Sequence, residues 1–317
     1  MAEIGLFLSS EEHDPRSLVS QAQRGEEAGF HSVFISDHFH PWIDRQGQSP
    51  FVWSVIGGIA ATTTHKITTG VTCPTFRIHP AIVAQAAATC QLLTGGRFVL
   101  GVGSGEALNE HILGQHWPPV ATRHEMLEEA VAVMRRLWEG QLVSHRGRYY
   151  TVDNARIYSL PDSPPPVMVS AFGPEALRLA ASIGDGWVTT RPDGEMLRSY
   201  RAQGGTGPSI AAVKVCWGPD EGKARQIAHE LWPTEGLPGQ ISQELAQPAY
   251  FEAGASLVTE EMIADKTPCG PDPERHLAAI SEYLDAGFDQ VYVNQIGPDQ
   301  AGFMEFFADE LRPRLSV

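Results

Sequence analysis

The sequence is poor in cysteine, in long apolar runs and in positive charge, and each shortage narrows the kind of protein it encodes. No two cysteines form a C-x-x-C pair, so we expect reduced, mostly buried thiols rather than a disulfide framework or a thiolate metal cluster. Apolar runs such as 55–61 fall far short of the roughly 18 residues that span a bilayer, and the amino terminus leads directly into a strand-like segment. These features predict a cytoplasmic protein. The cysteines are Cys73, Cys90, Cys216 and Cys269.

Acidic residues outnumber basic ones. The chain of 317 residues has 23 Lys and Arg against 38 Asp and Glu, a formal net charge of -15 at pH 7. Such a charge disfavours nonspecific attraction to nucleic acid phosphates or to anionic lipid surfaces. Because 42% of the residues are apolar, the chain has ample material for a core, which excludes disordered and fibrous classes. The expected partner is a small molecule.

Short apolar, β-branched segments alternate with helical patterns along the whole chain. In the clearest helical pattern, 126–138, the apolar residues form one stripe, with Glu near its start and Arg near its end. This alternation predicts parallel strands joined by helical crossovers, and eight such units close into an α/β fold, the (β/α)8 TIM barrel. The eight expected strands are 4–8, 32–35, 66–72, 98–102, 167–171, 187–190, 211–216 and 290–293.

Two stretches interrupt the alternation. Residues 141–166 contain Tyr149-Tyr150 and a Pro-rich exit, and residues 232–273 are rich in Pro, Gly and Gln. Structureless loops of this length are uncommon in compact domains unless they are functional. We therefore expect one domain over 1–317, with both stretches as insertions at the C-terminal face of the barrel strands.

On this architecture the active site forms where loops leave the carboxyl ends of the strands. The second expected strand is followed by Ser36-Asp37-His38-Phe39-His40-Pro41-Trp42. An imidazole beside a carboxylate can act as a base near neutral pH, and the carboxylate can fix its tautomer. A helix cap at Asp37 with an ordinary loop histidine is the alternative.

Two further strand exits combine glycine with polar residues. The segment 69–77, Thr-Gly-Val-Thr-Cys-Pro-Thr-Phe-Arg, can press main-chain amides against a planar ligand, or is simply a strand exit shaped by Pro. The segment 101–109 resembles a phosphate loop but has no G-K-S/T and carries Glu106 where G-x-G-x-x-G needs its third glycine. Glu106 and Asn109 suit proton transfer and hydrogen bonding, although an incidental surface Glu is the alternative.

A fourth exit, Ser170-Ala171-Phe172-Gly173-Pro174-Glu175-Ala176, leads into a helix whose first-turn amides can bind an anion such as a ligand phosphate. An ordinary βα turn with Pro near the first helical position explains the same residues. A protein of this acidity needs such oriented amides to hold a polyanionic cofactor, because its global charge repels one.

Taken together, these motifs resemble the luciferase-like superfamily of flavin and deazaflavin enzymes. The closest similarity is to the branch that contains F420-dependent glucose-6-phosphate dehydrogenase, and it covers nearly the whole chain, most weakly over 193–273. The resemblance implies a TIM barrel, bound coenzyme F420 and hydride transfer at its central ring. The residues that carry it are S-D-H-F-H-P-W at 36–42, P-T-F-R at 74–77, G-V-G-S-G-E-A-L-N-E at 101–110 and G-D-G-W at 184–187.

The resemblance also implies roles for single residues. His38 would take the proton of a substrate hydroxyl, Glu106 would protonate or polarise the ring edge that gains electrons, and Trp42 would wall the substrate pocket beside Glu11. No metal is implied, and a homodimer is expected. The cofactor would be held by Asp37, Gly70, Val71, Cys73, Asn109, Ala171, Phe172 and Gly173, with a cis peptide bond between Gly70 and Val71.

One departure from this branch concerns the substrate. The sugar-phosphate enzymes hold the substrate phosphate with two Lys and one Arg, and the nearest positions here are Pro192, Ser242 and Asp265. A dianion without cationic partners binds poorly, so glucose 6-phosphate is not the expected substrate unless Arg191 or Lys266 replaces a missing cation. Another alcohol, or the reverse reduction of a carbonyl or activated alkene, fits better.

Three other functions compete with this hypothesis. A metal-dependent hydrolase is one, because His38-x-His40 after a barrel strand has the spacing of amidohydrolase ligands, although later strand ends offer no further His or Asp ligands. An FMN-dependent monooxygenase on the same barrel differs less from the F420-dependent hypothesis than the hydrolase does, since flavin and deazaflavin differ at one ring atom. A noncatalytic cofactor-binding protein is the third.

Overall fold

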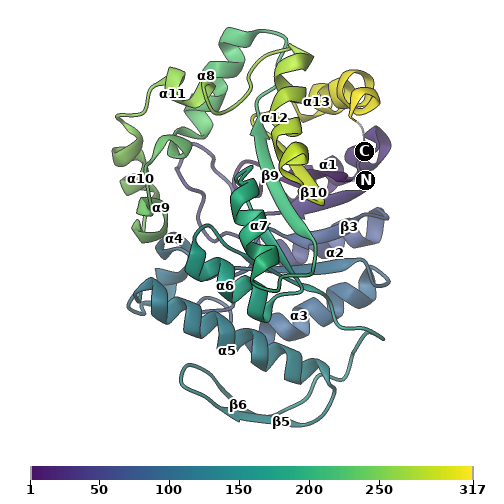
Figure 1. Ribbon diagram of the computed structural model, residues 1–317, viewed down its shortest axis with the longest axis vertical. Helices are drawn as coiled ribbons and strands as arrows, with labels where there is room; N and C mark the ends of the chain where they lie inside the picture. The colour runs from purple at the N-terminus through teal and green to yellow at the C-terminus, as the bar shows by residue number, and fades with distance from the viewer. Residues whose placement is uncertain (1, 316–317) are drawn as a thin grey trace.

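Eight parallel strands form a closed barrel in the computed structural model, which describes residues 2–315 (Figure 1). Around the barrel the order is β1, β2, β3, β4, β7, β8, β9 and β10, which pairs again with β1. The predicted TIM barrel is therefore confirmed. The strands are β1 (Glu3–Leu8), β2 (Ser32–Ile35), β3 (Lys66–Thr69), β4 (Phe98–Val102), β7 (Val167–Ser170), β8 (Gly186–Thr189), β9 (Ser209–Val215) and β10 (Gln290–Gln295).

Helices cover the outside of the barrel and bury their apolar stripes against it. Asp14 begins the first helix by accepting hydrogen bonds from the amides of Arg16 and Ser17, and Gly29 ends it with a left-handed φ of 95°. No helix within residues 2–315 is long and apolar enough to cross a membrane. The covering helices are α1 (Pro15–Ala28), α2 (Val52–Thr62), α3 (Pro80–Leu93), α5 (Val120–Trp138), α6 (Pro174–Ile183), α7 (Gly194–Ala202), α12 (Pro273–Ala286) and α13 (Gln300–Phe306).

Alternate strand residues fill the interior of the barrel, as the two-residue period of a strand requires. Gly101 shows how closely the strands approach, because a Cβ atom there would lie 1.9 Å from the carbonyl oxygen of Thr69. Phe7 and Val71, at the upper end of this interior cluster, are only partly buried, so the barrel is open at its C-terminal mouth. The buried members are Phe34, Val99, Met168, Val188, Ile210, Ala212 and Tyr292.

Residues 141–166 form an antiparallel hairpin, and the structure corrects their expected position. Its strands, β5 (Val143–Arg146) and β6 (Thr151–Ala155), follow the C-terminal end of α5 and precede β7. A segment between a barrel helix and the next strand starts from the N-terminal end of the barrel, so the expectation that it covers the C-terminal face is wrong. The hairpin packs along α5, and only its tip reaches the mouth loops, where the Tyr150 hydroxyl donates to the carbonyl of Pro74 at 3.0 Å.

Residues 232–273 lie at the C-terminal end of the barrel strands, as expected, and contain short helices joined by irregular chain. With α8 (Glu221–Leu231) they form one excursion between β9 and α12, visible at the left and top of Figure 1. The excursion returns to the barrel where Cys216 and Cys269 pair as a parallel bridge. Its helices are η2 (Pro233–Gly236), α9 (Ile241–Glu244), α10 (Pro248–Ala255) and α11 (Glu260–Ala264); other short helices are α4 (Ala107–Glu110), η1 (His111–Leu113), η3 (Phe307–Leu311) and η4 (Arg312–Arg314).

Candidate active site

Three strand exits bring an imidazole between two carboxylates at the barrel mouth. His38, after β2, places its Nε2 atom 3.5 Å from Oε1 of Glu11, which follows β1. The same nitrogen lies 3.9 Å from Oε1 of Glu106, which follows β4. The side chains of His38 and Glu11 are 10% and 2% exposed, so water weakens this interaction little.

The surroundings of His38 indicate which nitrogen acts as a base. Its Nδ1 atom lies 3.3 Å from the carbonyl oxygen of His40, and a carbonyl only accepts, so we assign the proton of the neutral ring to Nδ1. Nε2 is then the free basic nitrogen and faces both carboxylates. A proton taken by Nε2 creates an imidazolium that the Glu11 carboxylate, 3.5 Å away, stabilises.

Two serine hydroxyls orient Glu11. Its Oε2 atom accepts hydrogen bonds from the hydroxyls of Ser36 at 2.7 Å and Ser9 at 3.0 Å. Both donors hold the same oxygen, which leaves Oε1 directed at His38. The sequence indicated only that Glu11 lies near the substrate pocket, whereas the structure also makes it the partner of His38.

Asn109 ties the exit of β4 to that of β2. Its Nδ2 atom donates to Oε1 of Glu106, and its Oδ1 atom accepts from the amides of Phe39 at 2.7 Å and His40 at 3.0 Å. Asn109 therefore positions both Glu106 and the loop that carries His38. Its predicted contact with a cofactor stays a prediction.

Asp37 is buried in an ion pair below this group. Arg77 donates from Nη2 to Oδ1 of Asp37 at 2.8 Å, and the Thr72 hydroxyl donates to Oδ2 at 2.6 Å. The Asp37 side chain is 0% exposed and that of Arg77 is 6% exposed. The capping role that competed for Asp37 is not what the structure shows, and its predicted contact with the cofactor ring stays a prediction.

A second carboxylate completes this ionic cluster. Oε2 of Glu110 accepts from the Thr75 hydroxyl at 2.8 Å and from the amides of Phe76 and Arg77 at 2.9 Å each. Its Oε1 atom lies 3.6 Å from Nε of Arg77. Burial raises the pKa of Glu110, although these donors and Arg77 oppose that shift. Arg77 and Glu110 both stand in the sequence motifs, but the sequence assigned a role to neither. Their contact depends on the paths of two loops, which the sequence does not reveal.

An aromatic wall borders His38. The ring centroids of Trp42 and His38 are 5.0 Å apart, and Trp42 meets Phe251 of α10 edge to face at 5.3 Å. The excursion over residues 232–273 therefore supports the predicted wall of the substrate pocket from behind.

The remaining predicted cofactor residues lie on neighbouring exits around the same mouth. The peptide bond between Gly70 and Val71 is cis. Burial raises the pKa of the Cys73 thiol, and the nearby Glu106 and Glu110 raise it further, so this thiol stays protonated. At the start of α6, Gly173 provides no side-chain cap, and a Cβ atom there would meet no atom within 4 Å. These first-turn amides are thus open to an anion, beside Ala171 and a Phe172 that is 38% exposed.

Three positions correspond to the phosphate-binding cations of the sugar-phosphate enzymes, and here they hold uncharged or acidic residues. Pro192 and Asp265 are exposed and Ser242 is half-buried. Of the two replacement cations considered, Lys266 donates from Nζ to the carbonyl of Glu235 at 3.0 Å, whereas the exposed Arg191 guanidinium lies 5.8 Å from the ring centroid of Phe172.

His38 and His40, the pair with the spacing of metal-hydrolase ligands, each place Nδ1 beside a backbone carbonyl oxygen. Nδ1 of His40 lies 2.9 Å from the carbonyl oxygen of Leu108. Across the described range, residues 2–315, no group of three or more His, Cys, Asp or Glu is arranged to hold a metal ion. The metal-hydrolase alternative thus gains no support from this geometry.

The fold and the site define a TIM-barrel protein with an acid–base group at the carboxyl ends of its strands. Residues 1–290 match the luciferase-like monooxygenase family, and the chain belongs to that family. The resemblance inferred from the motifs is therefore confirmed.

Individual relatives are similar over almost their whole length. The F420-dependent glucose-6-phosphate dehydrogenase of Beutenbergia cavernae is 36% identical and covers 99% of this chain and 98% of its own. The structure of an F420-dependent secondary alcohol dehydrogenase in complex with an F420-acetone adduct is 32% identical, with a TM-score of 0.91 and 98% of each chain covered. A coenzyme F420 dependent tetrahydromethanopterin reductase from Methanopyrus kandleri shares the fold, with a TM-score of 0.80, 22% identity and 99% of each chain covered.

Proposed function

We propose that this chain interconverts a small uncharged alcohol and its carbonyl compound, with coenzyme F420 as the hydride carrier. The observation that carries the proposal is the basic Nε2 of His38 between Glu11 and Glu106 at an open barrel mouth. F420 dependence and oxidoreductase chemistry are common to the relatives that are at least 30% identical, and they confirm the cofactor and the enzyme class expected for this chain. The uncharged substrate is the new element of the proposal.

The residues at the mouth fit a planar cofactor with a phosphate-bearing tail. Phe7 and Val71 leave the floor partly open, and the α6 amino terminus offers uncapped amides beside Gly173. Asp37, Gly70, Val71, Cys73 and Asn109 would lie around the ring, and Ala171, Phe172 and Gly173 would hold the tail. Bound there, F420 supplies hydride transfer at its central ring.

The protein's own groups manage the proton. Nε2 of His38 takes the hydroxyl proton of the alcohol during oxidation and returns it during reduction. Glu11 stabilises the resulting imidazolium and keeps the ring oriented through the serine contacts described above. Glu106, oriented by Asn109, would supply a proton to the cofactor edge that gains electrons. Trp42 walls the pocket and excludes water from it.

The same site argues against a phosphorylated substrate. The positions nearest to the phosphate-binding cations of the sugar-phosphate enzymes hold Pro192, Ser242 and Asp265, and Lys266 donates to the carbonyl of Glu235. A phosphate dianion in this pocket would lack charge-assisted hydrogen bonds and would meet Glu11 and Glu106.

Two measurements test the proposal. Fluorescence titration should give saturable F420 binding in preference to FMN, and F420 absorbance should change with uncharged secondary alcohols, or with carbonyl or alkene substrates when reduced F420 is supplied. Efficient oxidation of glucose 6-phosphate would overturn the substrate assignment. Saturable FMN binding without a response to F420 would instead support the monooxygenase alternative. F420 binding without turnover of any such substrate would support a noncatalytic role.

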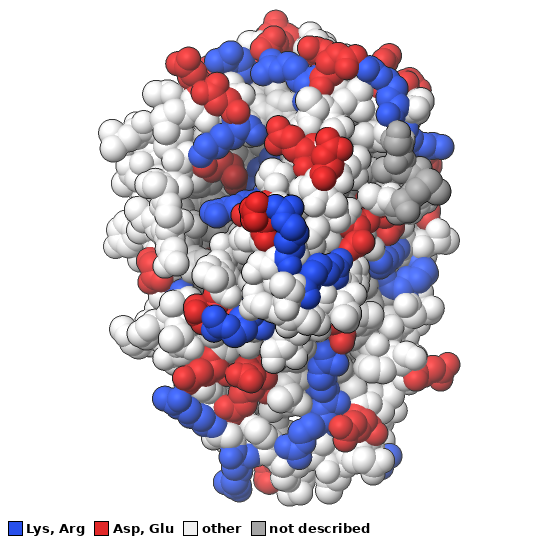
Figure 2. Space-filling model, viewed as in Figure 1, with Lys and Arg blue, Asp and Glu red and all other residues white. Residues whose placement is uncertain are grey.

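The proposal includes the organisation of the protein: one domain over 1–317, in the cytoplasm, that acts as a homodimer. The outer surfaces of α2 and α3 support the dimer, because neither helix carries an Asp, Glu, Lys or Arg in a chain of net charge -15. Two acidic copies therefore meet least repulsion at this face. Figure 2 shows acidic and basic side chains interspersed over one face of the molecule.

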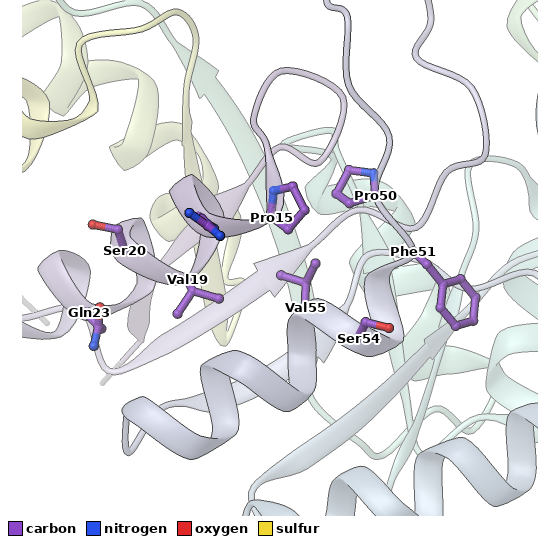
Figure 3. A pocket seen from close by; sticks show the side chains of 9 residues that line it. Pro15, Val19, Ser20, Gln23, Pro50, Phe51, Ser54 and Val55 are labelled. Carbon is purple, nitrogen blue, oxygen red and sulfur yellow. The ribbon is translucent and has the colours of Figure 1, made fainter.

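A groove runs along the α2 side of this surface, between α1 and α2. It has a volume of about 440 Å³, and Figure 3 shows Pro50, Phe51 and Val55 opposite Pro15 and Val19. The apolar side chains exposed here and on α3 are Phe51 (57%), Ile82 (57%), Leu92 (46%) and Leu93 (56%). Apolar surface of this kind is typical of contacts between subunits.

A further inference from the structure

A lysine stands inside the barrel mouth at the end of β9. Ile210 and Ala212 belong to the interior cluster, whereas Ala211 and Val213 pack toward the helices, so the strand period directs Lys214 inward. Lys214 follows the interior layer by two residues on the carboxyl side and is thus at the substrate end. Its side chain is 21% exposed. This is a cation where the sequence comparison with sugar-phosphate enzymes did not indicate one.

The excursion neutralises this lysine. Nζ of Lys214 lies 2.8 Å from Oε1 of Glu235 in η2, and its ammonium lies 4.3 Å from the ring centroid of Trp232. Trp232 donates from its indole nitrogen to Glu12 at 2.6 Å, and Glu12 is next in sequence to Glu11, the partner of His38. The Lys214–Glu235 pair is thus linked through two side chains to the acid–base group.

An unused amide stands beside the pair. Asn294 on β10 is in register with Lys214 on β9, and it faces inward because Tyr292, two residues earlier, belongs to the interior cluster. Asn294 is 1% exposed, and within the described part of the chain neither Nδ2 nor Oδ1 has a hydrogen-bond partner. A buried amide without hydrogen-bond partners is costly. We therefore expect a bound molecule to supply partners for these two atoms.

We propose that Glu235 sets the substrate class of this enzyme. Its carboxylate forms an ion pair with the ammonium of Lys214, so this cation is not available to a substrate phosphate. The neutral amide of Asn294 then offers hydrogen bonds to an uncharged hydroxyl or carbonyl oxygen. This inference rests on the proposed function, and it names the residue that enforces the uncharged substrate.

Electrostatics supports this role. A free Lys214 would attract a phosphate dianion, whereas the Glu235 carboxylate, 2.8 Å from its ammonium, makes the pair neutral and so removes that attraction. Lys266 also contacts Glu235, but through the backbone carbonyl. A substitution of the Glu235 side chain therefore frees Lys214 alone.

The test measures phosphate binding directly. We expect no saturable binding of glucose 6-phosphate to the wild type by calorimetry at millimolar concentration with saturating F420, which would occupy the open first-turn amides of α6. Glu235→Gln should bind glucose 6-phosphate at least tenfold more tightly, with an affinity that falls as salt rises. Adding Lys214→Met should abolish the gain.

A matched control is Glu260→Gln, which removes the same charge from the same excursion, where Glu260 pairs with Arg225 at 3.1 Å. It should leave phosphate binding unchanged. Glu235→Ala provides a second variant if the glutamine protein does not fold. The proposal is overturned if both folded Glu235 variants bind phosphate as weakly as the wild type, or if the wild type already binds it. F420 binding to each protein is titrated separately by fluorescence, so a failure of the proposed cofactor use would be seen on its own, as absent F420 binding.

Discussion

Nε2 of His38 lies 3.5 Å from Oε1 of Glu11, which joins the ends of β1 and β2 into one acid–base unit. The serine hydroxyls fix the carboxylate, and the His40 carbonyl fixes the imidazole. The pair is therefore preorganised before any substrate enters, and removal of either partner should affect chemistry more than binding.

His38→Ala should lower turnover by about a hundredfold or more, because a positioned general base contributes on that scale, while F420 affinity stays nearly intact. Glu106→Gln should behave similarly. Steady-state kinetics beside fluorescence titration measure the two effects. Loss of F420 binding by a folded variant would instead assign the residue to cofactor orientation.

Arg77→Met should destabilise the protein by about 3 to 5 kcal/mol, since it leaves Asp37 and Glu110 buried without their cation. Urea unfolding measures this free energy. The control is Arg135→Met, whose ion pair with Asp185 is 44% and 41% exposed and should contribute less than about 1 kcal/mol. Equal effects of the two substitutions would contradict the assigned burial of the cluster.

Glu12 should make stability fall as pH rises. Burial is the main cause that raises its pKa from 4.5 to about 7, so between these values the unfolded chain loses a proton that the folded chain keeps. Relative to the wild type, Glu12→Gln should therefore gain stability between pH 4.5 and 8, by at most about 3 kcal/mol and by less because water reaches part of the side chain.

Neighbouring His13 makes stability rise as pH rises, which is opposite to the effect of Glu12. The comparison of wild type with Glu12→Gln is therefore needed to separate the two groups. Burial lowers its pKa from 6.5 to about 4, so its contribution to stability is present above pH 6.5 and is lost as pH falls toward 4. The wild-type curve sums both groups, whereas the difference between wild type and variant isolates Glu12. A difference that does not change with pH would show that folding does not raise the pKa of Glu12.

Leu93→Asp should convert the proposed dimer to a monomer, because it places a charge on the uncharged surface of α3. We expect the dissociation constant to rise at least a hundredfold, measured by light scattering during gel filtration. Leu257→Asp is the control, since Leu257 is 85% exposed on the distant excursion. If the wild type is monomeric at micromolar concentration, the dimer proposal is wrong.

Local sequence patterns were sufficient for the barrel. Strand and helix periods depend on neighbouring residues, so all eight strands could be located, although β3 ends at Thr69, before the cis bond, and not at Thr72 as expected. The hairpin β5–β6 escaped prediction because its strands are short and half-exposed, and because Glu129 of α5 holds its turn by accepting from the amides of Arg148, Tyr149 and Tyr150.

Side-chain partners across the mouth depended on the tertiary structure. The motifs predicted His38, Glu106 and Asn109 as site residues, but no spacing in the sequence could join Glu11 to His38 or Arg77 to both Asp37 and Glu110. Closure of the barrel makes these contacts, because it brings the carboxyl ends of distant strands to one edge. The neutralised Lys214 depends further on the path of the excursion that carries Glu235 back over β9, since the interaction of two charges is decided by their distance and burial in space.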